Sequence, residues 1–212
     1  MASYANRADA GRRLAEELLP LFEGRRPVVL GLPRGGVPLA AEVSAALQAP
    51  LDVLVVRKIP TPGQPELALG AVGEGDVKVL NKRIVAALGL NEDQISQLAA
   101  ALAGEVEDRL RRFRGGDEGI PIRDRDVIVV DDGMATGASM MAAIAVASAQ
   151  GVGSVTVAVP VASVDAVKLV SQDADKVVTM GTPRYFRAVG EWYADFTQTT
   201  EEEVIELLAR YG

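Results

Sequence analysis

The stretch that decides the fold is residues 126–162, DVIVVDDGMATGASMMAAIAVASAQGVGSVTVAVPVA. Two apolar runs, 126–130 and 154–162, flank a segment of helical composition at 139–150, which Gly151 ends. Strands that are apolar along their whole length are typical of a parallel sheet covered on both faces. The stretch therefore predicts a right-handed strand–helix–strand unit.

The same alternation runs through the rest of the chain and sets the fold class. We expect further strands at 26–32, 51–59 and 176–180, and helices at 9–19, 37–48, 82–113, 164–172 and 200–211. Within 82–113 the pattern breaks near Gly89, and Asn91 with Gln94 forms a predicted capping box. Residues 61–70, rich in Pro and Gly, should not hold regular structure throughout. The segments 69–75 and 77–81 have the pattern of a short β-hairpin or of two strand pieces. The sequence predicts an α/β protein with a Rossmann-like, mostly parallel five-stranded sheet flanked by helices.

Composition removes several classes of function. The chain has 212 residues, a net charge of −7, no His and no Cys, which excludes a His-based triad and a His- or Cys-ligated metal site. It has no long block of Lys and Arg, so we expect no nucleic-acid partner. It also has no run of about 20 apolar residues and no signal-peptide pattern, so we expect no membrane association and a cytoplasmic location.

The turn after the strand at 126–130 combines acids with very small residues. Asp131 and Asp132 come first, and Gly and Ala then leave backbone N–H groups accessible at a predicted helix N-terminus, which favours an anion. Thr136 and Ser139 add hydroxyl donors. The acids can accept hydrogen bonds from a sugar diol, or help to place a divalent cation, while the turn holds a phosphate. The alternative is an ordinary tight turn with an acidic lip, and neither a Walker motif nor G-x-G-x-x-G is present.

The segment VIVVDDGMATGAS (127–139) resembles the phosphoribosyl-pyrophosphate (PRPP) motif of type I phosphoribosyltransferases, and its DDxxATG form is most similar to adenine-type members. The resemblance implies that Asp131 and Asp132 contact the ribose hydroxyls and hold Mg²⁺ indirectly, through those hydroxyls or water. It implies further PRPP contacts at Gly133, Met134, Ala135, Thr136, Gly137, Ala138 and Ser139. Some family members have an Asp that accepts a proton where this chain has Ala135, so any protein acid or base must come from elsewhere.

A second segment, LPRGGVP (32–38), is similar to the pyrophosphate loop of the same family. Gly35 and Gly36 would expose backbone N–H groups, and Arg34 would offer a planar fork of donors to phosphate oxygens. The resemblance implies a cis peptide in this loop, which we place at Arg34–Gly35. An ordinary tight turn is the alternative.

A third segment, residues 55–75, is similar to the mobile catalytic loop of adenine-type enzymes. Arg57 and Lys58 would neutralise the departing pyrophosphate, although a solvated basic pair is the commoner fate of such a dipeptide. Glu74 is an acid–base candidate, and Glu66 is a weaker one.

The aromatic tail is loosely similar to the C-terminal hood of purine-type members, which reads the base. Phe186 or Trp192 could stack on a base and the backbone near Val189 could read its edges, or these residues could simply fasten the tail to the sheet. We therefore expect a PRPP-binding core over 1–180 and a hood segment over 181–212. The N-terminal helix could belong to either of them. The Leu/Ala face of 91–113 would be core or the surface of a homodimer.

These features together predict an enzyme that transfers the phosphoribosyl group of PRPP to a small heterocyclic base, with Mg²⁺ as cofactor and pyrophosphate as product. One alternative is a non-catalytic regulator of the same fold that binds PRPP or a nucleotide. Another is a hydrolase or kinase-like phosphate enzyme on a similar sheet, which the absent Walker lysine and absent His disfavour.

Overall fold

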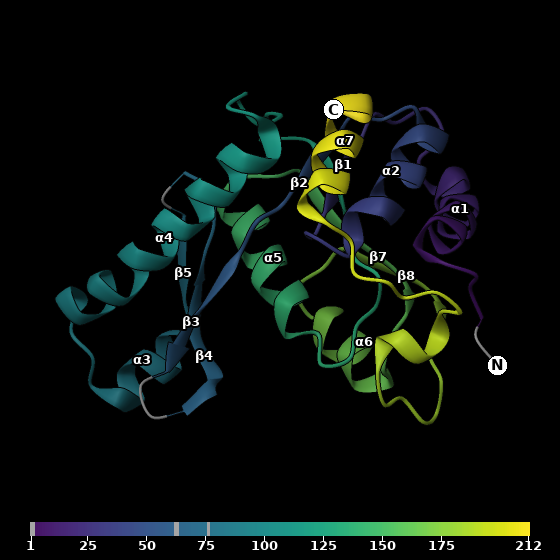
Figure 1. Ribbon diagram of the computed structural model, residues 1–212. Helices are drawn as coiled ribbons and strands as arrows, with labels where there is room; N and C mark the ends of the chain where they lie inside the picture. The colour runs from purple at the N-terminus through teal and green to yellow at the C-terminus, as the bar shows by residue number, and fades with distance from the viewer. Residues whose placement is uncertain (1–2, 62–63, 76) are drawn as a thin grey trace.

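The computed structural model describes residues 3–61, 64–75 and 77–212, with the side chains of 64–67 and 82 outside the description. Its core is a five-stranded sheet in the order β2-β1-β6-β7-β8, and every neighbouring pair is parallel (Figure 1). The strands are β1 (Val28–Gly31), β2 (Leu51–Val53), β6 (Asp126–Val130), β7 (Ser154–Val161) and β8 (Lys176–Gly181). The predicted fold class is confirmed.

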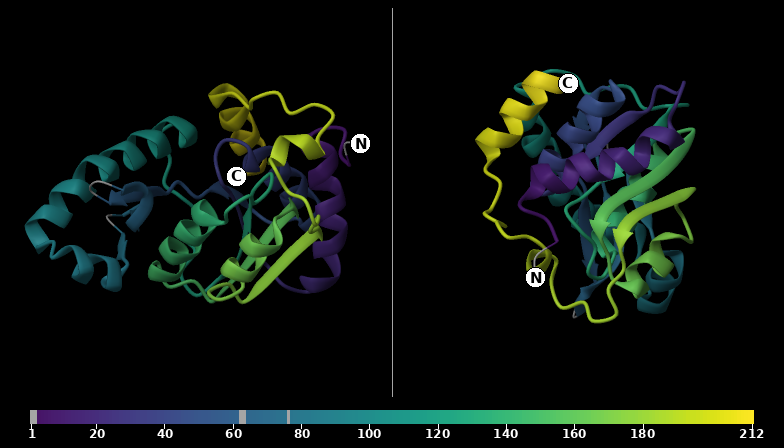
Figure 2. Two further views of the ribbon diagram at one scale, coloured as in Figure 1. Left: turned by 90° about the horizontal axis from the view of Figure 1, so that it is seen from below. Right: turned by 90° about the vertical axis from the view of Figure 1, so that its right-hand side faces the viewer.

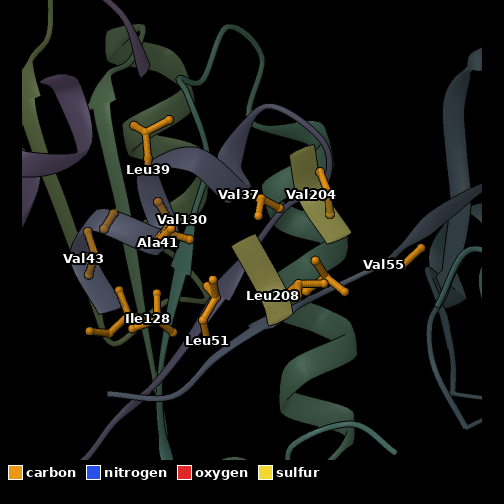
Figure 3. Close-up of a cluster of buried hydrophobic side chains, with 14 of the residues drawn as sticks. Val37, Leu39, Ala41, Val43, Leu51, Val55, Ile128, Val130, Val204 and Leu208 are labelled. Carbon is orange, nitrogen blue, oxygen red and sulfur yellow. The ribbon is translucent and has the colours of Figure 1, made fainter. Parts of the chain in front are cut away.

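Helices cover both faces of this sheet. One face carries α1 (Arg7–Leu18), α2 (Gly36–Leu47) and α7 (Glu201–Tyr211), and the other carries α5 (Ala138–Ala149) and α6 (Val164–Val170). Alternation along β6 explains the division, because Ile128 and Val130 enter the first layer while Val127 and Val129 enter the second. Val204 and Leu208 of α7 join the first layer (Figure 3), so the last helix is bound to the core by apolar burial.

An arm projects from this core between β2 and β6. It consists of β3 (Arg57–Thr61), β4 (Gln64–Val72), β5 (Lys78–Leu80), α3 (Lys82–Leu88) and α4 (Glu92–Arg114). The three strands form a separate antiparallel sheet in the order β3-β4-β5, and α4 lies along it (Figure 2). The β4–β5 pairing confirms the predicted hairpin.

One prediction about the arm was wrong. The run 51–59 is not one strand, since β2 ends at Val53 and β3 belongs to the other sheet. In the segment 61–70, β3 ends at Thr61 and β4 starts at Gln64, and the residues between them lie outside the description. Pro60 is accommodated because β3 is an edge strand and its register shifts on either side of that residue, where a missing N–H is tolerated.

Helix ends follow the predicted chemistry. Asn91 and Gln94 form the capping box of α4, Gly89 ends α3 in the left-handed region, and Thr200 forms a capping box with Glu203 at the start of α7. Two short 3₁₀ helices complete the elements, η1 (Leu19–Leu21) and η2 (Val189–Trp192). Within the described residues, no helix combines the length and apolarity that crossing a membrane requires.

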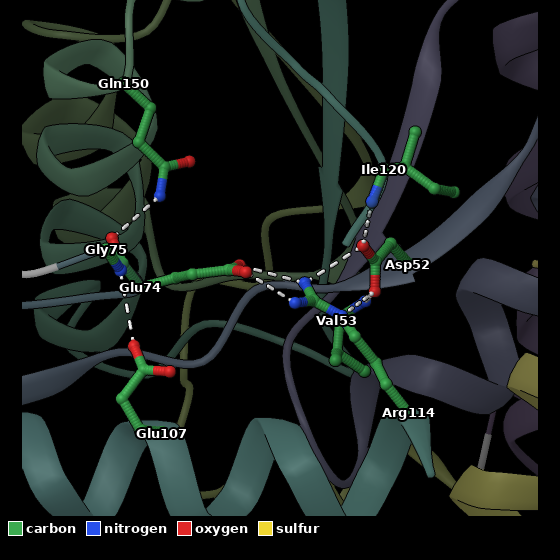
Figure 4. A network of polar contacts seen from close by, with 8 residues as sticks. All are labelled: Asp52, Val53, Glu74, Gly75, Glu107, Arg114, Ile120 and Gln150. Atoms are coloured by element: carbon green, nitrogen blue, oxygen red, sulfur yellow. Dashed lines mark hydrogen bonds and ion pairs between the residues drawn. The ribbon is translucent and has the colours of Figure 1, made fainter. Parts of the chain in front are cut away.

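Arg114, the last residue of α4, ties the arm to the core (Figure 4). Its guanidinium donates to both oxygens of Asp52 in β2, each at 2.9 Å, and to both oxygens of Glu74, at 2.6 and 2.9 Å. Asp52 also accepts from the backbone N–H of Ile120. The Arg114 and Asp52 side chains are only 10% and 6% exposed, so removing either leaves a buried charge without its partner.

We expect Arg114→Ala to lower the free energy of unfolding by about 3 kcal/mol, the usual cost of breaking a buried ion pair on one side. Urea unfolding followed by circular dichroism measures the change. Arg111→Ala is the matched control, because its ion pair with Asp108 is exposed and should contribute less than about 0.5 kcal/mol. Equal midpoints for the two variants would contradict this role of Arg114.

Candidate active site

Two helices begin at the carboxyl edge of the central sheet without a side-chain cap. They are α2, which starts after β1 with Gly35 as its N-cap residue, and α5, which starts after β6 with Gly137 in that position. Each of the other five described α-helices has a capping side chain, from Asn6, Asn81, Asn91, Ser163 and Thr200. The two uncapped N-termini therefore present positive dipole ends at one edge of the sheet.

The turns that lead into these two helices are in contact. A Cβ atom added to Gly35 would collide with the carboxylate of Asp132, and one added to Gly36 would collide with the backbone of Val130 and Asp131. Glycine is therefore required at both positions for the turns to approach this closely. The structure thus brings the predicted pyrophosphate loop and the predicted PRPP motif together.

The turn at 133–139 leaves amide donors exposed. Gly137 has a φ of +76°, which favours glycine, and the backbone N–H groups of Ser139 and Met140 have no acceptor among the described residues. The hydroxyls of Thr136 and Ser139 are on exposed residues. Met134 differs from this group, because its side chain is buried and its backbone bonds to the β7 strand and to Ser163.

The two carboxylates are each engaged on one oxygen. Asp131 Oδ1 accepts from the backbone N–H of Asp132 at 2.9 Å, and Asp132 Oδ2 accepts from Arg7 Nε at 2.9 Å and pairs with Arg7 Nη2 at 2.8 Å. The second oxygen of each carboxylate has no partner in the part of the chain that the structure describes. One acceptor oxygen of each carboxylate is therefore left for hydroxyl donors.

Arg7 belongs to the site although it comes from the other end of the chain. Besides its contacts with Asp132, its Nη1 donates to the backbone oxygen of Thr197 at 2.6 Å, and its guanidinium lies 4.0 Å from the centre of the Phe196 ring. Tyr193 completes the group, since its hydroxyl donates to the backbone oxygen of Asp132 at 2.6 Å. The start of α1 and the aromatic tail thus form the wall beside the acids.

The acids have perturbed titration. Burial, and then the charge of Asp132, raise the pKa of Asp131 well above its usual value, and the hydrogen bond from the Asp132 backbone N–H and then the charge of Arg7 partly offset both causes. Burial also raises the pKa of Asp132, against the hydrogen bond and the charge of Arg7. Burial and the charge of Asp132 raise the pKa of Tyr193, so this hydroxyl stays protonated as a donor. Carboxylates that are costly to ionise are typical of functional sites.

Comparison with known proteins agrees with this geometry. The family model for the phosphoribosyl transferase domain matches residues 2–191. The chain belongs to the phosphoribosyl transferase family. Two Mycobacterium tuberculosis proteins, from strains CDC 1551 and H37Rv, are each 48% identical over 210 residues, 99% of this chain and 47% of theirs; the latter is named "Putative phosphoribosyl transferase Rv0571c". The chain spans about half the length of these curated relatives.

A solved structure shares the whole fold. The crystal structure of TT1426 from Thermus thermophilus is 44% identical, with a TM-score of 0.91 and complete coverage of both chains. The arm, which the sequence did not predict as a separate sheet, is therefore part of a shared architecture.

The predicted cations come from two places, the loop before α2 and the start of β3. Arg34 is half-buried in that loop, and the cis peptide is Pro33–Arg34, one bond earlier than predicted. Arg57 begins β3 and pairs with Glu105 at 2.7 Å. Lys58 is exposed and lines a groove of about 400 Å³ with Ala138, at the start of α5.

Glu74 does not lie with these residues. Its carboxylate is held by Arg114, and its backbone oxygen accepts from Gln150, which follows the last residue of α5. Since α5 has 12 residues, about 18 Å of helix separates that end from the phosphate turn. This position argues against the predicted acid–base role of Glu74, whose carboxylate instead joins the arm to Arg114. The side chain of Glu66 lies outside the described residues.

The predicted base-binding residues occupy different positions. Val189 packs against Gly133, where a Cβ would meet its side chain, and so lies directly on the turn that follows β6. Trp192 accepts two backbone hydrogen bonds, from Ser3 and Tyr4, and its indole Nε1 is buried without a partner among the described residues. Phe186 is half-buried.

The sequence analysis missed Arg7, Tyr193 and Phe196 as site residues. Tyr193 and Phe196 belong to the aromatic tail for which a base-binding role was predicted, but that prediction named Phe186, Val189 and Trp192 instead. Nothing local marks Arg7, because the residue it contacts is 125 positions away in the chain. The only available signal was general: an acid pair at a buried strand end needs a nearby cation.

Proposed function

We propose that this protein transfers the 5-phosphoribosyl group of PRPP to a nitrogenous base and releases pyrophosphate. The observation that carries the proposal is the pair of uncapped helix N-termini, α2 and α5, on either side of two carboxylates with free oxygens. PRPP has an anionic group at each end of a sugar that carries a vicinal diol. The site offers donors, then acceptors, then donors in the same order.

The 5′-phosphate would bind at the start of α5. The amides of Ser139 and Met140 and the hydroxyls of Thr136 and Ser139 are donors without a capping side chain to compete for them. The helix dipole adds to their attraction for a dianion. Asp131 and Asp132 would then accept hydrogen bonds from the ribose hydroxyls through their unpartnered oxygens.

The pyrophosphate group would lie over the loop before α2. The backbone N–H groups of Arg34 and Gly35 have no partner in the described ranges, and the Arg34 side chain is a planar double donor. Arg57 and Lys58 add positive charge from β3. Mg²⁺ supplies charge neutralisation on pyrophosphate when bound, and Asp131 and Asp132 would hold it through ribose hydroxyls or water, which their free oxygens fit.

This distribution of charge suits the transfer step. The bond between C1 of the ribose and the pyrophosphate oxygen breaks as the base nitrogen forms its bond to C1, so positive charge grows on the sugar and negative charge on the leaving group. Carboxylates lie under the sugar, and cations with amide donors surround the leaving group. Holding both reactants in place supplies a further part of the acceleration. The proposed base contacts are Val189, Phe186 and Trp192, on the hood side.

A pyrophosphate-release assay tests the proposal. The full chain is incubated with PRPP, Mg²⁺ and one member at a time of a panel of purines and pyrimidines. We expect release that depends on both PRPP and one class of base. Tight PRPP binding without release for any base would instead favour a regulator, and failure to bind PRPP would refute the assignment of the site.

A further inference from the structure

The junction between the arm and the core gathers charged side chains on one face of α4. Glu105, Arg109 and Arg112 follow one another at spacings of four and three, which places them on the same side of the helix. Glu105 pairs with Arg57 of β3 at 2.7 Å, and Arg112 pairs with Glu201 of α7 at 3.3 Å. The face thus lies between the edge of the arm sheet and the start of α7.

Arg109, in the middle of this face, has no matching carboxylate. It is half-buried, and it makes no ion pair or hydrogen bond within the described part of the chain. Burial lowers the pKa of Arg109, and the charges of Arg57, Arg112 and Arg34 lower it further, whereas Glu201 opposes them. Three other guanidinium groups are therefore close enough to repel it.

Two of its neighbours also have unmet donors. Arg34, in the predicted pyrophosphate loop, has no hydrogen-bond or ion-pair partner in the described ranges. Its charge contributes to lowering the pKa of Glu202, but the Glu202 side chain is exposed to solvent. The Nε atom of Arg57 is buried without a partner among these residues. Arg34, Arg57 and Arg109 thus gather positive charge on a chain whose net charge is −7, and some of their N–H groups have no acceptor among the described residues. Such a cluster indicates a site for an anion with several oxygens.

We infer that Arg109 is a pyrophosphate-binding residue that α4 contributes from the arm, on the same helix face as Glu105, the partner of Arg57. The inference rests on the proposed function, and it extends the site from the two sheet loops to the arm. Pyrophosphate bound at the junction connects the arm and the core through its oxygens. Arg112 has a different role, because Glu201 already satisfies it.

A ligand-binding role and a structural role of Arg109 predict different effects on the melting temperature. An arginine that only held the fold together would lower the melting temperature when removed. Arg109 sits among repelling cations without a partner in the described ranges, so Arg109→Ala should leave the melting temperature of the ligand-free protein unchanged or raise it. Arg111, two residues away on an exposed face and paired only with Asp108, provides the matched control.

The test measures binding of inorganic pyrophosphate with Mg²⁺, and separately of ribose 5-phosphate, by calorimetry and by thermal shift. Arg109→Ala should weaken pyrophosphate binding about 10- to 100-fold, the loss expected for charge-assisted hydrogen bonds, and change ribose 5-phosphate binding less than about twofold. Arg109→Lys should recover part of the loss, and Arg111→Ala should match the parent protein.

Each other outcome has a defined meaning. Pyrophosphate binding by Arg109→Ala that equals the parent's, or a parent protein that binds no pyrophosphate, overturns the inference. A lower melting temperature without ligand, with both ligands weakened alike, also overturns it, since that marks a structural residue. The pyrophosphate-release assay tests the proposed function separately, and that function fails if no base leads to release of pyrophosphate from PRPP.

Discussion

The double variant Asp131→Asn, Asp132→Asn is expected to lose PRPP turnover by at least about 1000-fold. Each carboxylate has one oxygen free for a ribose hydroxyl, and both carry the negative charge that faces the developing positive charge of the sugar. Loss of two charge-assisted contacts at roughly 2 kcal/mol each corresponds to that factor. Initial rates of pyrophosphate release at saturating PRPP provide the measurement.

The single variant Asp131→Asn should also unfold at a higher temperature than the parent at pH 7. Burial and Asp132 raise the pKa of Asp131, so folding is favoured when this group is neutral, and that contribution is lost as the pH rises through the folded-state pKa. Asn avoids the loss and can still accept from the N–H of Asp132. Melting curves from pH 4 to pH 8 should converge at the acid end. Full turnover in the double variant, or a lower melting temperature for Asp131→Asn at pH 7, would refute these roles.

Arg7→Ala is expected to reduce kcat/KM about 100-fold at pH 7 and to move the acid limb of the pH profile to higher pH. Arg7 lowers the pKa of both Asp131 and Asp132 against burial, so its removal raises both values and leaves fewer ionised acids at pH 7. Tyr193, the other titratable group facing them, stays protonated throughout. Rates measured from pH 5 to pH 9 determine the shift, and activity should recover partly at high pH.

Two controls separate this effect from general damage. Arg7→Lys keeps the charge and should restore much of the acid limb, although it lacks the planar fork that reaches both Asp132 and Thr197. Arg12→Ala removes an exposed arginine of the same helix, paired with Glu42, and should behave as the parent does. An acid limb that stays in place in Arg7→Ala would show that Arg7 does not tune the acids.

The sequence predicted the central sheet well because its signals are local. The apolar run 126–130 became β6 with the same bounds, and the turn after it took the predicted place at the start of α5. The segment 32–38 likewise reached the same edge, since both follow parallel strands. Motifs at strand ends can thus be assembled into a site from one sequence.

The separate sheet of the arm and the contacts of Glu74, Arg7 and Arg109 were not predicted, for a different reason. Pro60 argues against a strand unless the strand is known to be an edge, and edge position depends on partners that only the folded chain supplies. Glu74 looked mobile and catalytic in a Pro- and Gly-rich stretch, yet Arg114, 40 residues later, holds it. Arg7 and Arg109 gain their meaning only from residues distant in the chain.

The contact of Arg7 with the backbone oxygen of Thr197 spans 190 positions. Arg7 emerges from the ribosome long before Thr197 is synthesised. The strands of the central sheet, which end at Gly181, are therefore complete before the residues that form the wall beside the acids. The ability to bind a ligand should therefore appear late in synthesis, only after residues 193–197 have emerged from the exit tunnel.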